Sequence, residues 1–330
     1  LTPISWLFRG LTALRRLAFR HGWLGSARLP VPVVVVGNII VGGAGKTPLT
    51  LYLARQLRAA GLRPGIVSRG YGSAQEGVAA VSPEATPAQV GDEPLLLARE
   101  SGCPVWIGRD RAAAARALLA ASPDCNLILC DDGLQHYRLA RDVEIAVCDV
   151  RGLGNGRLLP RGELREPAES LRRADCIVLT RADKTGPTPA RIARIADASG
   201  IPVFRAVHRF RELIGPGGGV LPPEHLRGKK VCAFCGIAKP ASFKKILLEA
   251  EAEVLSFIDF PDHYVYNRDD LEALRRHFSA QNADCRLTTE KDAMRLEAFP
   301  DFLKTLFVAR VEMEILPTTP SFEDFIINRL

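Results

Sequence analysis

A glycine-rich loop that follows a run of valines constrains this chain more than any other feature. Val33–Val36 is a short apolar run, positions 37–48 read GNIIVGGAGKTP, and a helical pattern extends from Thr47 to Ala60. A strand, a glycine-rich loop and a helix in this order direct backbone amides and a helix N-terminus toward one point, where they bind phosphate oxygens. The order predicts a P-loop, although Ile40 stands where the strict motif has its first glycine.

The loop also predicts which residues hold a nucleotide. Lys46 is expected to reach the β- and γ-phosphates, and Thr47 to hold Mg²⁺. The alternative is a glycine loop without a ligand, which the flanking strand and helix disfavour. Contacts to phosphate are expected along the rest of the loop, at Gly42, Gly43, Ala44, Gly45 and Pro48.

Short aliphatic runs alternate with helical stretches from Val31 onward. Continuous apolar strands separated by helices are typical of a parallel sheet covered on both faces, so we expect an α/β fold with a doubly wound parallel sheet. A composition of 47% hydrophobic and 25% charged residues excludes a disordered or low-complexity chain. The runs are 33–36, 65–67, 104–107, 127–130, 144–148 and 176–179, and the helical stretches include 47–60, 94–101 and 109–121.

A second, smaller α/β domain is expected in the C-terminal half, because 330 residues suggest about two domains. Residues 204–213 and 306–315 both alternate as strands do, and they enclose a block with strands and helices of its own. We interpret these two segments as a two-stranded hinge. The predicted P-loop domain covers 25–203, with 316–330 returning to it, and the hinge with the smaller domain covers 204–315.

Two acids end one of the predicted strands. Asp131 and Asp132 follow the apolar run 127–130. Carboxylates at the C-terminal end of a strand lie where α/β sheets bind ligands, so one of them can hold Mg²⁺ directly or through water. Such a pair often only caps a strand, but beside a P-loop it becomes a candidate metal site.

Basic residues follow two other strands in the same way. Ser68 and Arg69 follow the second run, and Arg109 and Arg111 follow the third. The arginines are candidates for holding a phosphate on the acceptor or for stabilising transferred charge. Salt bridges on a helix face are the alternative, and we expect that alternative for Arg111 more than for the others.

The N-terminal residues 1–24 are predicted to form an amphipathic helix that associates with membranes. Arginines interrupt every apolar run, so the helix cannot span a bilayer. Trp6 and Trp23 flank its apolar stripe, as aromatic residues do in helices that lie in the membrane interface. The alternative is a helix packed on its own domain. The stripe holds Ile4, Leu7, Leu11, Leu14 and Ala18, and the opposite face holds Arg9, Arg16 and Arg20.

The net charge limits the classes of binding partner to expect, and the cysteines indicate the redox state of the cellular compartment. A net charge of +7 favours phosphate-rich partners, but no nucleic-acid recognition signature accompanies it. The eight cysteines are scattered, which fits a reducing compartment. In the strand-like segment 231–235, Cys232 and Cys235 are expected on different faces, which disfavours a metal or redox role.

Motifs along most of the chain resemble those of the tetraacyldisaccharide 4'-kinase (lipid A 4'-kinase) family. Taken together they are specific, and the resemblance runs in order from the N-terminal helix to about residue 296. The motifs are Gly37–Pro48, Ser68–Gly72, Val90–Pro94, Asp131–His136, Leu164–Pro167, Ala233–Ile237, Phe260–His263 and Leu287–Asp292.

The resemblance implies an enzyme that transfers the γ-phosphate of ATP, with Mg²⁺, to the 4'-hydroxyl of an acylated glucosamine disaccharide 1-phosphate. It implies a peripheral protein at the cytoplasmic face of the bacterial inner membrane. The resemblance also implies a P-loop core with a hinged smaller domain, which agrees with the two-domain division above. No nucleic acid and no obligate protein partner are expected.

The resemblance also implies roles for particular residues. Asp92 matches the family's catalytic acid and His263 its partner, although the residues around Asp92 alone favour a helix N-cap. Tyr264 stands where the family often has another histidine. A role that the family gives to this second position therefore need not apply here, whereas the role expected of His263 is unaffected. Lys46 and Arg165 are expected to be catalytic, and Glu166 is expected to be a metal ligand. The residues expected to contact the substrate are Asn38, Ser68, Arg69, Arg109, Gln135 and His136.

Two further interpretations stay open on the residues alone. The segment Thr289–Asp292 either contacts nucleotide and closes the site or forms a structural turn. A regulatory P-loop GTPase or ATPase of the metallochaperone type is the alternative function, because Thr180–Asp183 faintly resembles a guanine-reading motif.

Overall fold

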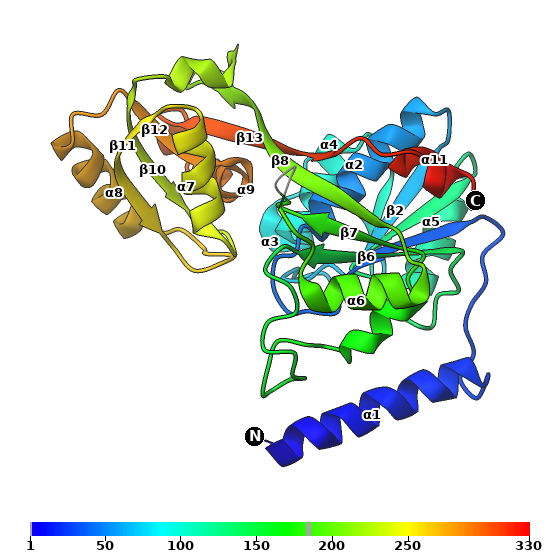
Figure 1. Cartoon of the computed structure of the whole chain (residues 1–330). Helices are drawn as coiled ribbons and strands as arrows, with labels where there is room; N and C mark the ends of the chain where they lie inside the picture. Colours follow the sequence, from blue (N-terminus) through cyan, green and yellow to red (C-terminus); the bar gives the residue numbers. More distant parts are fainter. Residues whose placement is uncertain (1, 183–185) are drawn as a thin grey trace. The chain divides into compact units, whose positions relative to one another are not determined.

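The structure, a computed structural model, describes residues 2–182 and 186–330. It divides into two compact units, Leu1–Val207 with Met313–Leu330 and His208–Glu312. Both are α/β, and the predicted parallel-sheet fold is confirmed. The boundaries lie a few residues from those expected, inside the two strands interpreted as the hinge (Figure 1).

The first unit is built on a largely parallel sheet in the order β8-β7-β6-β1-β5-β2-β4-β3. Only the β3–β4 pair in this order is antiparallel among the described pairs. All of β1 is buried, as its continuous apolar run predicts for a strand covered on both faces. The strands are β1 (Val33–Gly37), β2 (Pro64–Ser68), β3 (Ala79–Ala80), β4 (Val105–Ile107), β5 (Leu127–Asp131), β6 (Val143–Asp149), β7 (Cys176–Thr180) and β8 (Val203–Ile214).

Helices follow the strands of this unit, and the three predicted from the sequence form within two residues of their expected starts. Asp110 caps α5 by accepting hydrogen bonds from the amides of Ala112 and Ala113. The C-terminal α11 lies on this unit, where Phe322 packs edge-on against Phe204. The helices are α1 (Thr2–Arg20), α2 (Lys46–Ala59), α3 (Pro87–Val90), α4 (Asp92–Glu100), α5 (Arg111–Ala121), η1 (Ala168–Arg173), α6 (Ala190–Ser199) and α11 (Phe322–Ile327).

The second unit contains the strand order β11-β10-β12-β13-β8. Two hydrophobic clusters pack in it, one containing Cys235 with Phe243 and the other containing Cys232 with Phe278. The two cysteines therefore face different clusters, as alternation predicts. The elements are β9 (Val220–Leu221), η2 (Pro223–Leu226), β10 (Lys230–Cys235), α7 (Pro240–Glu249), β11 (Glu253–Asp259), α8 (Arg268–Ala280), β12 (Cys285–Thr289), α9 (Glu290–Arg295), η3 (Leu296–Ala298), α10 (Pro300–Leu303) and β13 (Phe307–Ile315).

Helix α1 leaves its apolar stripe uncovered within the first unit. Ile4, Leu7, Leu11 and Leu14 expose between 56% and 64% of their surface. The helix is held instead through another face, where the Ser5 hydroxyl donates to the Leu158 carbonyl at 3.0 Å and Arg16 donates to Ser170 at 2.7 Å. The helix therefore does pack on its own domain, but not through the stripe, which stays exposed. No helix among the described residues is long and apolar enough to cross a membrane.

Candidate active site

The glycine-rich loop joins the end of β1 to the start of α2, as predicted for a P-loop. Gly42 and Gly45 have φ of 102° and 93°, a left-handed conformation that disfavours other residues. Two side chains at the C-terminal end of β7 hold the loop: Thr180 Oγ1 donates to the Ala44 carbonyl at 2.7 Å, and Arg181 Nη1 donates to the Gly43 carbonyl at 3.2 Å. This leaves the helix N-terminus at the loop as a preformed anion site.

Asp131 anchors the first turn of α2 beneath the loop. Its carboxylate accepts hydrogen bonds from Thr47 at 3.3 Å and Thr50 at 2.9 Å, and the residue is 1% exposed. Burial raises the pKa of Asp131 to about 7, and the charges of Glu93 and Asp132 add to this shift. The strand end thus places a hydroxyl and a carboxylate oxygen together, which are the hard ligands that Mg²⁺ prefers.

Two cations converge on Asp132, the next residue. Arg165 Nη1 lies 3.1 Å from both carboxylate oxygens, and Lys46 Nζ lies 3.6 Å from Oδ1. Burial by itself would raise the pKa of Asp132, but the charges of Lys46 and Arg165 outweigh it and hold the pKa below its usual range. The structure therefore brings both of these predicted catalytic cations to one carboxylate beside the loop.

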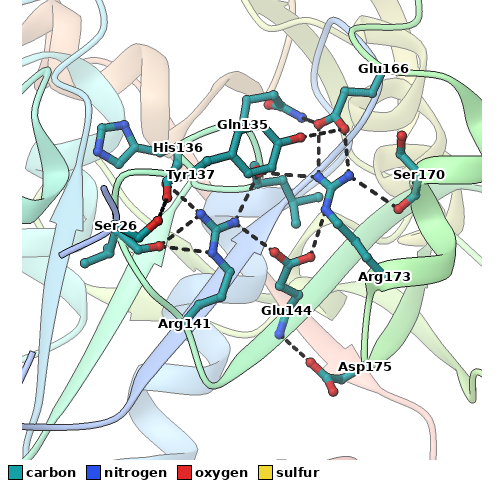
Figure 2. A network of polar contacts seen from close by, with 12 residues as sticks. Ser26, Gln135, His136, Tyr137, Arg141, Glu144, Glu166, Ser170, Arg173 and Asp175 are labelled. Atoms are coloured by element: carbon teal, nitrogen blue, oxygen red, sulfur yellow. Dashed lines mark hydrogen bonds and ion pairs between the residues drawn. The ribbon is translucent and has the colours of Figure 1, made fainter. Parts of the chain in front are cut away.

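Glu166 is the centre of a buried polar network (Figure 2). Its two oxygens accept hydrogen bonds from Gln135 at 2.8 Å, Tyr137 at 2.9 Å and Arg173 at 2.6 and 3.0 Å. Burial opposes ionisation, but the bonds and charge of Arg173 outweigh it, and the pKa of Glu166 is lowered. The role of Glu166 as a metal ligand stays a prediction, because both oxygens here accept bonds from protein side chains.

The same network reaches the P-loop and contains residues that the sequence analysis did not single out. Gln135 Nε2 also donates to the Asn38 carbonyl at 2.9 Å, next to the loop. Arg141 and Arg173 lie 5.6 and 5.5 Å from the centre of the Tyr137 ring, and both form ion pairs with Glu144. One sequence signal was available: Glu144 is a charged residue inside a buried strand, which requires a partner.

His136 and Arg111 lie together at the start of α5. The backbone amide of Arg111 donates to His136 Nε2 at 3.2 Å. Burial, with the charge of Arg111 acting in the same direction, lowers the pKa of His136 to about 4, so the imidazole is neutral. Arg111 is itself buried, donates to the carbonyls of Arg109 and Asp132, and leaves its Nε without a hydrogen-bond partner among the described residues. The expectation of a helix-face salt bridge for Arg111 is wrong.

The other predicted substrate residues end neighbouring strands. Ser68 is the last residue of β2 and pairs in register with Ile107 at the end of β4. Arg69 and Arg109 follow these two positions and are exposed. They therefore lie at the same edge of the sheet as the P-loop, and their contacts with substrate stay a prediction.

Asp92 opens α4 and does not cap it. The capping position is taken by Gly91, whose φ is 88° and where a Cβ would lie 2.5 Å from the Tyr71 carbonyl. The N-cap interpretation of Asp92 is therefore wrong by one residue. Glu93, which the sequence analysis did not single out, contributes to the raised pKa of Asp131, so the first turn of α4 lies close to the acid pair.

His263 belongs to the second unit, where its φ is 60° and its Nε2 lies 3.7 Å from Asp262. Since Asp92 belongs to the first unit, the pairing of Asp92 with His263 stays a prediction. In the segment Thr289–Asp292, Thr289 caps α9, and Asp292 accepts hydrogen bonds from Gly236 and Tyr266. These contacts favour the structural turn.

Comparison with known proteins decides the family. A model of the family described as tetraacyldisaccharide-1-P 4'-kinase (LpxK) matches residues 1–330. The tetraacyldisaccharide 4'-kinase of Dechloromonas aromatica is 45% identical over 332 residues, which span 100% of this chain and 92% of that protein. The corresponding enzyme of Chromobacterium violaceum is 47% identical over 300 residues, 90% of this chain and 83% of that protein. The chain belongs to this family.

A solved structure agrees with the family. The crystal structure of LpxK from Aquifex aeolicus in complex with ATP has a TM-score of 0.80 and 30% identity, and the match covers 99% of this chain and 98% of that one. The predicted enzyme class is confirmed: as a member of the LpxK family, this chain is an ATP-dependent kinase of lipid A biosynthesis. Membership decides against the regulatory GTPase alternative, whose proposed base-reading residue, Asp183, lies outside the described residues.

Proposed function

We propose that this kinase binds ATP with Mg²⁺ at the P-loop and phosphorylates the 4'-hydroxyl of an acylated glucosamine disaccharide 1-phosphate. The convergence of Lys46 and Arg165 on Asp132, beside the loop, carries the proposal. Phosphoryl transfer needs positive charge placed where the transferred group passes, and these cations supply it. When phosphate is bound, Lys46 and Arg165 exchange part of their contact with Asp132 for phosphate oxygens.

Thr47 and Asp131 would hold the Mg²⁺ ion, which supplies charge neutralisation at the phosphates. Their oxygens already lie within hydrogen-bond distance of each other. Mg²⁺ usually takes few protein ligands and keeps waters and phosphate oxygens, so this small donor set fits it. Asp132 follows Asp131 and would reach the ion directly or through water. Glu166 would join this set only if one of its oxygens exchanged a protein donor for the ion or a water bound to it.

The acceptor hydroxyl must lose a proton as it attacks. Asp92 would accept this proton and His263 would orient the carboxylate, as the family resemblance implies. His136 is buried as a neutral imidazole and Gln135 is fixed between Asn38 and Glu166, so both can position the sugar without adding charge.

The protein would reach its substrate at the cytoplasmic face of the inner membrane. An acylated disaccharide keeps its chains in the bilayer, so the enzyme must approach the surface. The exposed stripe of Ile4, Leu7, Leu11 and Leu14 on α1 supports this proposal.

The deciding experiment measures transfer of labelled γ-phosphate to a purified tetraacyldisaccharide 1-phosphate in mixed micelles, with ATP or GTP as donor. We expect product with ATP, and a loss of about 100-fold or more in kcat for Lys46→Ala and Thr47→Ala, because each removes a group that contacts developing charge. Thr47→Ser, which keeps the hydroxyl, is the matched control. Near-normal kcat in both alanine variants at saturating ATP and Mg²⁺ would show that the loop is not the donor site.

A further inference from the structure

The segment after β7, whose sequence faintly resembles a guanine-reading motif, contacts the P-loop through its first two side chains. Thr180 Oγ1 donates to the Ala44 carbonyl, and its methyl group would lie 3.2 Å from a Cβ placed on Gly45. Arg181 Nη1 donates to the Gly43 carbonyl at 3.2 Å. These two side chains, which we call the loop anchors, therefore hold three successive residues of the loop.

The sheet fixes both loop anchors. Thr180 is fully buried and is paired in register with Asp149 of β6 on one side and Ala206 of β8 on the other. The Asp149 carboxylate is buried and accepts from Arg181 Nη1 at 2.6 Å, so it holds the guanidinium that reaches the loop. Arg181 has a φ of 57°, a left-handed conformation that is uncommon outside glycine. Side chains supported in this way on strands keep their positions better than side chains on loops do.

The loop anchors decide the direction of a backbone amide in the P-loop. A trans peptide unit is planar, so its C=O and its N–H point in opposite directions. Because Thr180 holds the Ala44 carbonyl, the N–H of Gly45 points away from Thr180. The glycines of the loop would otherwise let this peptide unit rotate at little cost, since glycine has access to more backbone conformations than other residues. A side chain outside the loop thus sets the direction of an amide at the start of α2, where phosphate would bind.

We propose that Thr180 and Arg181 are positioning residues that set the P-loop for polyphosphate before a nucleotide arrives. The proposal rests on the donor site proposed above, and it assigns the start of this segment to the phosphates and not to the base. Donors that are already oriented bind more tightly, because less conformational freedom is lost on binding. Loss of a loop anchor should therefore weaken the binding of every polyphosphate, with or without a base.

The test measures dissociation constants of ATP and of tripolyphosphate, each with Mg²⁺, for the full chain without lipid substrate. Thr180→Val removes the hydroxyl and keeps the methyl group. We expect about fivefold weaker binding of both probes, the usual effect of one lost hydrogen bond. Thr180→Ser keeps the hydroxyl and should bind both probes nearly as the wild type does. In the micelle assay, KM for the tetraacyldisaccharide 1-phosphate should be unchanged in Thr180→Val.

Two matched variants control for structural damage. Thr288→Val makes the same change at a buried strand threonine whose hydroxyl has no hydrogen-bond partner among the described residues. Arg151 pairs with Asp149 as Arg181 does, but its side chain is 72% exposed and its described contacts are with Asp149. Arg181→Met should weaken both probes about tenfold or more, because a charged donor is lost, whereas Arg151→Met and Thr288→Val should bind them normally. Thermal melts should show all forms folded.

Weaker binding of ATP with unchanged binding of tripolyphosphate would show that the segment reads the base and would overturn the proposal. Normal binding of both probes by Thr180→Val, or an equal loss in Thr288→Val, would overturn it too. So would wild-type protein that binds ATP but not tripolyphosphate, since a loop set in advance needs no base.

Lys46→Ala separates this proposal from the proposed function. If Lys46→Ala loses turnover while Thr180→Val binds both probes normally, the P-loop is still the donor site and only the positioning role is wrong. Near-normal turnover in Lys46→Ala would count against the donor site itself.

Discussion

At the residue scale, burial decides the charge that each site residue carries. His136 is held neutral by burial beside Arg111, whereas Asp132 is held ionised by Lys46 and Arg165. The two pKa values thus depart from their ordinary values for different reasons, burial for His136 and nearby cations for Asp132. This difference predicts how stability responds to acid.

His136 should make the protein less stable as the pH falls. The pKa of His136 is about 4 in the folded chain, whereas its ordinary value is 6.5. At a pH between these two values, the imidazole is protonated in the unfolded state but not in the native state. The free energy of unfolding therefore decreases as pH falls from 6.5 toward 4. His136→Gln, which keeps an acceptor for the Arg111 amide, should lose less stability between pH 7 and pH 5 in urea titrations.

The control is His21→Gln at an exposed position of the same unit. It should retain the wild-type loss of stability in acid. An unchanged loss in His136→Gln would mean that other groups account for the acid sensitivity.

At the scale of elements, the short helix η1 connects the network of Figure 2 to the strands. Arg173 ends η1 and pairs with Glu166 and with Glu144 of β6. Arg16 of α1 donates to Ser170 of the same η1 helix. A hydrogen bond therefore joins α1 to η1, and ion pairs of Arg173 with two buried carboxylates join η1 to β6 and to Glu166, so these carboxylates depend on Arg173.

Replacing Arg173 should be costly. Arg173→Leu would leave Glu144 and Glu166 without their shared partner in a buried setting, and removal of one member of a buried ion pair costs about 3–5 kcal/mol. The neighbouring Arg172 is exposed and offers a matched control, since exposed changes usually cost about 0.5 kcal/mol or less. Denaturant unfolding of Arg172→Leu and Arg173→Leu should differ accordingly, and similar midpoints would contradict the role of the network.

The exposed stripe of α1 should matter for membranes more than for folding. Replacing Leu7, Leu11 and Leu14 by polar residues should abolish co-sedimentation with anionic liposomes and leave the melting temperature almost unchanged, because these side chains are already exposed. Turnover should fall mainly on long-chain substrate in bilayers. Phe8, which packs against the core, is the contrast: Phe8→Ser should lower the melting temperature.

Liposome binding that persists in the triple variant while its melt collapses would show that the stripe packs on protein. Charge reversal at Arg9, Arg16 and Arg20 should also weaken binding, by about fivefold for each residue near an anionic surface.

At the scale of the whole molecule, the chain places predicted catalytic residues on two units. Asp92 lies in the unit that holds the P-loop and His263 in the other. Both strands that connect the units, β8 and β13, are continuous across the boundary. The joint action of Asp92 and His263 therefore stays a prediction, which kinetics can test.

If Asp92 and His263 act as one group, their effects should not multiply. Asp92→Ala and His263→Ala should each lower kcat, and the double variant should be little worse than the poorer single variant. Tyr264→Phe, at the neighbouring position, should leave kcat nearly unchanged and serves as the control. Fully multiplicative losses would show that the two residues act independently.

Local patterns along the chain were sufficient to predict the elements and the edge of the sheet at which the P-loop lies. Apolar runs, helical periodicity and the order of strand, glycine loop and helix are local signals, so β1, α2 and the acids at the C-terminal end of β5 could be predicted with near-correct bounds. In a parallel sheet these strand ends must meet at one edge, whatever their separation along the chain. Hence the P-loop and Asp131 could be placed together without coordinates.

The pairing of side chains, by contrast, depends on the folded chain and could not be predicted from local patterns. Arg111 was expected in a surface salt bridge but is buried beside His136, and Arg173 lacked any local pattern that marks it as the partner of Glu166. Such pairings depend on how loops and short helices pack over the sheet, which no periodicity encodes. The same holds for α1: its pattern shows an apolar stripe, but only the packing of its other face through Ser5 leaves that stripe exposed.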